Sequence, residues 1–183
     1  MAHAGAMMQR EVRGTQGGMT HYPVMFTFQD VVSGNGFLAG VTMCGRALIF
    51  QEAGEEWWTD GVHPGGIADT GSSAMEAFSN FRNTHKKALF DIAEEAANFD
   101  AFAAEVERFF RETNVAEEKR WEEAVQAFRS GKITPEEPFS SLPRVAPEER
   151  PCNIRVDRLD KIESNKFSAG FNVPDKIALP KAA

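Results

Sequence analysis

Hydrophobic and polar residues alternate along the first part of the chain. In the run from 22 to 32, hydrophobic side chains occupy every second position and therefore share one face. This period of two is typical of a half-buried β-strand. Similar runs follow at 37–43 and 46–52, after stretches that contain glycine. We therefore expect an antiparallel meander of three strands, with residues 55–62 as a fourth strand or a covering loop.

The hydrophobic spacing becomes helical after residue 72. Ser73 precedes Glu76 by three residues, as in a capping box, where each side chain binds a free backbone N–H group at the start of a helix. Hydrophobic residues at three- and four-residue intervals then predict a main helix over 73–97 that packs on the sheet. The same spacing predicts two further helices before Gly131.

These elements define an α+β protein in which a small antiparallel sheet of three to four strands packs on the main helix. Residues 1–20 lack periodicity, and we expect a disordered leader there. Residues 21–132 are expected to form the α+β core with its helical extension. Residues 133–183 begin with a proline-rich stretch, which predicts a linker and an extended tail lying back across the core. Within this tail, Ile154 and Val156 alternate with charged residues, as in an edge strand.

The charge balance of the chain argues against sequence-independent binding to nucleic acids. Asp and Glu outnumber Lys and Arg by 27 to 20, which gives a formal net charge of -7, whereas phosphate contacts need clustered basic residues. A basic protein partner fits this balance better. No run approaches the roughly 20 apolar residues that cross a bilayer, and the first residues lack the apolar core of a signal peptide. We therefore expect a cytoplasmic protein without membrane contact.

The cysteines indicate neither a metal site nor a disulfide framework. Cys44 and Cys152 are far apart in the sequence, and neither belongs to a CxxC motif. We expect reduced thiols, and we expect no metal or other cofactor.

The turn from Gly61 to Gly71 is the clearest local motif. It precedes a helix, but it lacks the glycine spacing and the lysine of phosphate-binding loops. We interpret it as a structural turn followed by a helix cap, formed by Gly65, Gly66, Gly71, Ser73 and Glu76. No catalytic set is evident, so we expect a protein that is not an enzyme. The alternative is an enzyme or a small-ligand-binding protein that uses this turn, with His63 and Asp69 as its polar groups.

Adjacent tryptophans next to acidic residues form the candidate contact surface. Because Trp57 and Trp58 point to opposite faces of an extended segment, one of them should lie on the surface or beneath the C-terminal tail. Exposed aromatic side chains beside negative charge are suited to contact with a partner protein or with a second copy of the chain. The residues of this predicted surface are Glu55, Glu56, Trp57, Trp58 and Asp60.

Part of the sequence resembles the HicB family of antitoxins. The similarity covers Tyr22 to about Ala97 and rests on the run YPVMFTFQD, on Gly36-Phe37 at the start of the second strand, and on GGIADTGSSAMEAFSNFRNTHKKAL with its Glu76-Ala77 pair. The resemblance implies a truncated RNase H-like β-β-β-α-β domain that oligomerises. It also implies that the domain neutralises a small basic toxin, an mRNA interferase of the HicA type.

The chain also departs from the pattern of that family. The usual PDLPGC segment is replaced by EEWWTDGVHPGG, and the region after Phe99 is longer and more helical than the short tail of the family. We find no pattern of a C-terminal helix-turn-helix or ribbon-helix-helix domain in residues 133–183, and we therefore do not expect direct DNA binding. A further alternative is a non-catalytic structural protein of a mobile element.

Overall fold

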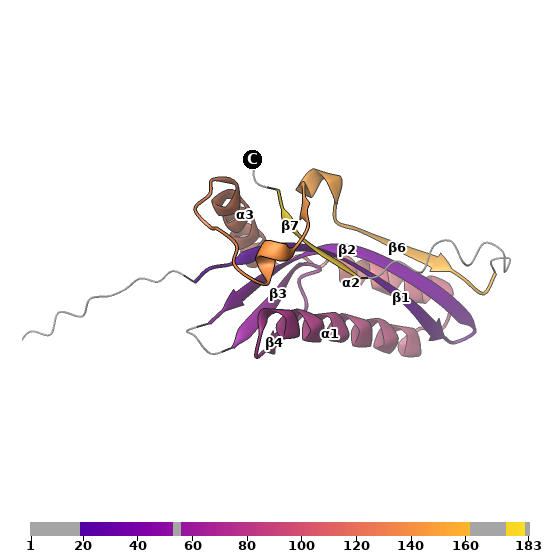
Figure 1. The fold of residues 1–183 in the computed structure, drawn as a ribbon. Coiled ribbons are helices and arrows are strands. Elements are labelled where there is room, and N and C mark those ends of the chain that lie inside the picture. Colours follow the sequence, from indigo (N-terminus) through magenta and orange to yellow (C-terminus); the bar gives the residue numbers. More distant parts are fainter. Residues whose placement is uncertain (1–18, 53–55, 162–174, 182–183) are drawn as a thin grey trace, which may run out of the picture.

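Alternating residues at the start of the chain form a long β-hairpin that organises the fold (Figure 1). The computed structural model describes residues 19–52, 56–161 and 175–181. Two further strands extend the hairpin into the antiparallel meander that the alternation predicts. The four strands are β1 (Tyr22–Gly34), β2 (Phe37–Gln51), β3 (Trp57–His63) and β4 (Ala68–Gly71).

Three helices follow the meander. The side chain of Ser73 caps the first by accepting a hydrogen bond from the backbone N–H of Glu76 at 3.2 Å. The Glu76 carboxylate accepts from the backbone N–H of Ser72 at 2.8 Å, so the reciprocal bond of the capping box is shifted by one residue. The helices are α1 (Ala74–Glu95), α2 (Phe99–Arg111) and α3 (Val115–Arg129).

The C-terminal third of the chain adds three strands to the sheet, so the prediction of three to four strands is too small. In the described residues the sheet has seven strands in the order β4-β3-β2-β1-β7-β5, with β6 also paired to β2. Because β2 is long, its second half pairs with β3 and its first half with β6. The added elements are η1 (Phe139–Ser141), β5 (Arg144–Val145), η2 (Pro147–Glu149), β6 (Asn153–Arg158) and β7 (Lys176–Pro180).

Helices cover both faces of the sheet. In Figure 1, α1 runs along one face of the β1–β2 hairpin, and α3 lies on the opposite face near the open end of the hairpin. On the α1 side, Phe26 and Phe81 are fully buried in one hydrophobic cluster. On the α3 side, Leu48 and Val62 pack with Trp121 in another. The sheet is therefore the central layer of a mixed α+β fold.

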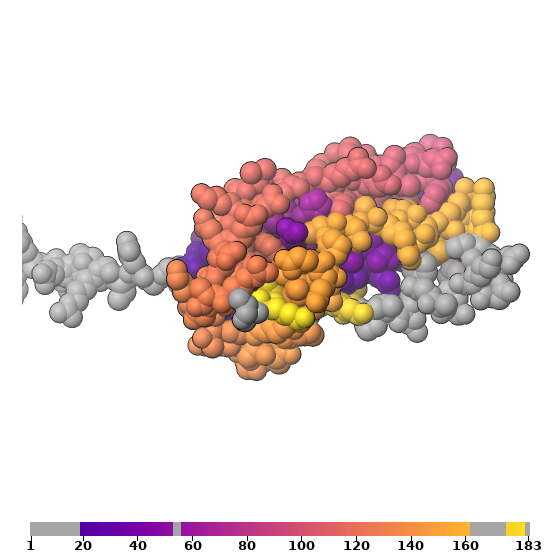
Figure 2. Space-filling model, turned by 90° about the horizontal axis from the view of Figure 1, so that it is seen from above, coloured from indigo at the N-terminus to yellow at the C-terminus, as the bar shows by residue number. Residues whose placement is uncertain are grey.

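The proline-rich stretch lies against the core. Phe139 of η1 is 1% exposed, and its ring stacks on the ring of Tyr22 at a centroid distance of 3.8 Å. Figure 2 shows the orange and yellow C-terminal segments lying over the sheet beside the helices. Packing of this kind brings residues from the end of the chain to the surface around α3.

Candidate functional site

The two tryptophans of β3 point to opposite faces of the sheet. Trp57 lies on the α1 side, where its ring is 6.4 Å from Tyr22 and 6.0 Å from Phe139. Trp58 packs against the cluster beneath α3. Both side chains are half-buried, because the sheet is covered on both faces and the C-terminal segment shields Trp57.

Only part of the predicted contact surface comes together. Asp60 is half-buried and lies on the same face of β3 as Trp58, two residues further on. Glu56 is exposed just before the strand, and Glu55 lies outside the described residues. Trp57 faces the other side of the sheet. The site that the fold forms therefore centres on Trp58 and Asp60.

A hollow opens beside Trp58 at the edge of α3. It has a volume of about 440 Å³. The His21 ring stands against the Phe50 ring in its wall, with centroids 4.9 Å apart. We call it the Trp58 hollow; its lining residues are Met19, His21, Phe50, Glu52, Trp58 and Arg120.

Charged groups of both signs lie around the Trp58 hollow: Glu52 and Arg120 line it, and Glu117 pairs with Arg120. Glu117 is only 6% exposed, and its Oε1 accepts a hydrogen bond from Arg120 at 2.5 Å. Its Oε2 is buried without a hydrogen-bond partner among the described residues. Asp60 lies close enough to Glu117, Glu52 and Arg120 to interact electrostatically with all three.

The surroundings of the hollow shift the pKa values of Asp60 and His21. Burial raises the pKa of Asp60 to about 6, and the negative charges of Glu117 and Glu52 add to this effect while Arg120 opposes it. Burial likewise lowers the pKa of His21. With a pKa of about 6, Asp60 is partly protonated near that pH, and a cation bound beside it would favour its ionised form.

This arrangement is suited to holding a cation. The ring faces of Trp58 and Phe50 carry negative quadrupole potential that attracts ammonium and guanidinium groups, and the carboxylates supply acceptors. Sequence reasoning found Trp58 and Asp60 but missed His21, Phe50, Glu52, Glu117 and Arg120. Glu117 gave a usable signal, because it falls four residues before Trp121 on the buried face of α3.

The glycines of the 61–71 turn permit close packing. The backbone N–H of Gly65 donates to the carbonyl of Glu112 at 2.7 Å. A Cβ atom at Gly65 would lie 2.2 Å from the backbone nitrogen of Asn114, and one at Gly71 would lie 2.4 Å from that of Ala77. At Gly66 the nearest atom would be the mobile carboxylate of Glu112, at 3.2 Å. This geometry favours the structural interpretation of the turn.

His63 and Asp69 do not converge. Asp69 pairs across the sheet with Thr59 and accepts a hydrogen bond from the Thr84 hydroxyl at 2.7 Å. His63 lies four residues beyond Thr59, or about 13 Å along the strand, and its Nδ1 is 3.0 Å from the Thr113 hydroxyl. A shared site for His63 and Asp69 at this turn has no support in the geometry.

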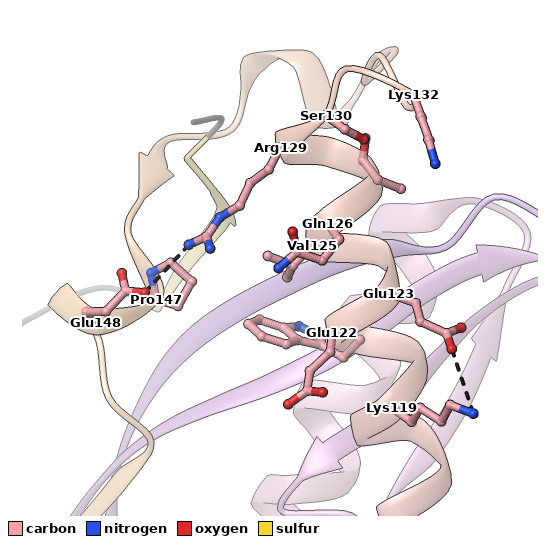
Figure 3. A pocket seen from close by; sticks show the side chains of 12 residues that line it. Lys119, Glu122, Glu123, Val125, Gln126, Arg129, Ser130, Lys132, Pro147 and Glu148 are labelled. Carbon is pink, nitrogen blue, oxygen red and sulfur yellow. Dashed lines mark hydrogen bonds and ion pairs between the residues drawn. The ribbon is translucent and has the colours of Figure 1, made fainter.

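A wider groove runs between α3 and η2 (Figure 3). It has a volume of about 760 Å³, and Val125 and Pro147 are among the residues that line it. Figure 3 shows Arg129 reaching from α3 toward Glu148 across the groove, where their side chains are 3.6 Å apart. Sequence reasoning missed this groove, because nothing local indicates that the proline-rich stretch returns to α3.

Searches for a metal site, for membrane-spanning helices and for similar proteins gave the following results. Among the described residues, no cluster of three or more His, Cys, Asp or Glu side chains is arranged to hold a metal ion. None of the helices in that part of the chain is both long and apolar enough to cross a membrane. Comparison of the chain with protein-family models, with curated proteins and with solved structures finds no match.

Proposed function

We propose that this chain is a protein-binding module that receives a basic side chain of its partner in the Trp58 hollow. The observation that carries the proposal is that the rings of Trp58 and Phe50 line one hollow together with the Glu52 carboxylate. Asp60 lies close enough to Glu52 to interact with it electrostatically. A lysine or arginine from a partner would meet the ring faces and the carboxylate together there.

The electrostatics of the whole chain favour the same partner class. A net charge of -7 attracts a basic protein during diffusional encounter and speeds association. At the hollow, a cation would stabilise ionised Asp60 and lower its pKa from about 6. Binding should therefore release a proton at mildly acidic pH and tighten as the pH rises.

The sequence resemblance suggests the more specific form of the proposal. A HicB-like antitoxin would bind a small basic RNase, and it would act as an oligomer. The resemblance over 22–97 and the acidic charge support this identification. The element order differs from that of the family in two respects: β4 stands between β3 and α1, and α2 and α3 stand between α1 and the next strand. Cytoplasmic location belongs to the same proposal.

Affinity capture with matched baits tests the proposal. Tagged wild-type protein, Asp60→Asn and Asp91→Asn would be incubated with host lysate, and eluates would be analysed by mass spectrometry and gel filtration. Asp91 lies on the exposed side of α1, so its variant removes the same charge at a remote position. Circular dichroism would verify that both variants fold.

We expect wild type and Asp91→Asn to retain a basic protein at fixed stoichiometry, and Asp60→Asn to lose most of it. A small basic protein with RNase activity in the eluate would support the antitoxin-like form. Equal recovery on all three baits would refute the role of the hollow. Recovery of no partner would refute the binding module and favour the structural or small-ligand alternatives.

A further inference from the structure

A third pocket, close in size to the Trp58 hollow, lies at the first turn of α3. It has a volume of about 460 Å³, within the range of small-molecule sites. On β2, Arg46 of this pocket is four positions before Phe50 of the Trp58 hollow, or about 13 Å along the strand. We call it the Arg46 pocket; its lining residues are Arg46, His63, Glu118, Pro147, Glu148, Pro151 and Cys152.

A β-bulge shapes the floor of this pocket. Arg46 pairs with His63, but Ala47 pairs with Gly61, so Val62 is an extra residue on β3. Bulges re-aim side chains and are frequent beside binding sites. The Arg46 guanidinium lies over the Trp121 ring at 4.7 Å from its centroid, and it also interacts with the Cys152 side chain.

Opposite charges line the Arg46 pocket without pairing. Among the described residues, Arg46 has no carboxylate at ion-pair distance, and Glu118 has no cation at that distance; both are half-buried. Glu148 is already matched by Arg129 at 3.6 Å. A half-buried guanidinium and a half-buried carboxylate that face one pocket unpaired both benefit from a ligand that carries the complementary charges.

The other lining groups fit a polar ligand that is bound without covalent chemistry. His63 is held by Thr113 through Nδ1, and Nε2 has no hydrogen-bond partner in the described part of the chain. Burial and the positive charge of Arg46 lower the pKa of His63. Burial raises the pKa of the Cys152 thiol, so this cysteine is a wall of the pocket rather than a nucleophile.

We propose that the Arg46 pocket binds a small zwitterion, an amino acid whose carboxylate pairs with Arg46 and whose ammonium group pairs with Glu118. Guanidinium and carboxylate form two parallel hydrogen bonds, and Glu118 rejects ligands that carry only negative charge. This binding activity is separate from the proposed protein-binding role, and it places a small-ligand site at His63 that does not use Asp69.

Isothermal titration with a graded set of ligands tests the proposal. Glycine, β-alanine and 4-aminobutyrate separate the two charges by increasing distances, while acetate and methylammonium each carry one charge. We expect one of the three amino acids to bind more tightly than either single-charge ligand. We expect Arg46→Met, which keeps an unbranched side chain but removes the charge, and Glu118→Gln each to weaken that binding by about tenfold or more.

Glu122→Gln is the matched control, because it removes one carboxylate from the same helix on the side of the α3–η2 groove. Its affinity should equal that of wild type. As a second measurement that needs no variant, the NMR signals of the His63 ring should shift on titration of wild-type protein with the bound amino acid. Absence of both heat and shift with all three amino acids would overturn the proposal. Acetate that binds as tightly as every amino acid would also overturn it.

Discussion

A histidine buried in the aromatic core should make the protein lose stability in mild acid. His85 on α1 is 1% exposed and is surrounded by phenylalanine rings. Its Nδ1 donates a hydrogen bond to the carbonyl of Phe81 at 3.1 Å. Its Nε2 is buried without a partner among the described residues. An added proton on Nε2 would thus be charged, desolvated and unpaired.

The magnitude follows from the shift of the His85 pKa. Burial lowers this pKa from 6.5 to about 4 in the folded protein, and the nearby charge of Arg82 acts in the same direction. Below pH 6.5 the unfolded chain takes up a proton that the folded protein refuses, so stability falls as the pH falls from 6.5 toward 4. At pH 5 the loss reaches about 2 kcal/mol, and it approaches about 3 kcal/mol below pH 4.

Urea denaturation at pH 7 and pH 5 measures this loss for wild type and for His85→Gln. The amide of glutamine can replace the bond to the Phe81 carbonyl, and it does not titrate. The free energy of unfolding should fall by about 2 kcal/mol more in wild type than in the variant over this interval. His21→Gln is the control, since His21 is half-buried near the surface and its removal should change the difference much less.

The same fall in wild type and in His85→Gln would refute the reasoning. Such a result would mean that His85 titrates near its ordinary pKa in the folded protein, and that acid sensitivity comes from carboxylates. Direct NMR titration of the ring would then show a midpoint near 6.5 instead of about 4.

Further predictions concern packing and charge. Arg82 pairs with Asp30 at 2.9 Å. Arg82→Met should lower the free energy of unfolding, measured with denaturant, by about 3–5 kcal/mol, because it leaves the Asp30 carboxylate, which is 7% exposed, without this partner. The double variant Arg82→Met with Asp30→Asn should recover part of that free energy. Gly65→Ala should lower the melting temperature sharply, whereas Gly66→Ala should leave it nearly unchanged, because only the first Cβ meets fixed backbone. Ser73→Ala should cost about 1 kcal/mol through the lost cap of α1, measured by the same unfolding assay.

The meander and the main helix were predictable because their signals are local. Alternation in β1 reports one buried face of a strand, and Ser73 with its first-turn glutamate reports the start of α1. These patterns depend on residues that are neighbours in the sequence. The mixed α+β class follows from them.

The remaining strands were harder to predict, because their pairing depends on distant residues. β5 has two residues and β7 five, lengths at which periodicity carries little information. β6 shows alternation, and its place beside the first half of β2 is set by the length of β2. The undercount of strands therefore came from β5 and β7, while the edge strand expected around Ile154 and Val156 is β6.

The candidate site was predictable only in part for the same reason. Trp58 and Asp60 share one strand face, so their proximity follows from the period of two. The other walls of the hollow come from the residues just before β1, from the end of β2 and from α3, which only the tertiary fold brings together. Exposure of Trp57 depended on whether a distant segment covers it, and Phe139 does so.

The affinity of the captured partner at pH 5 and pH 7 tests the central claim most directly. With a pKa of about 6, Asp60 is mostly protonated at pH 5 and mostly ionised at pH 7. Wild-type protein should bind a basic partner up to about tenfold more tightly at pH 7, while Asp60→Asn should bind weakly and with little change between the two pH values. Equal affinity and equal pH dependence in wild type and Asp60→Asn would contradict a cation-binding role for the Trp58 hollow.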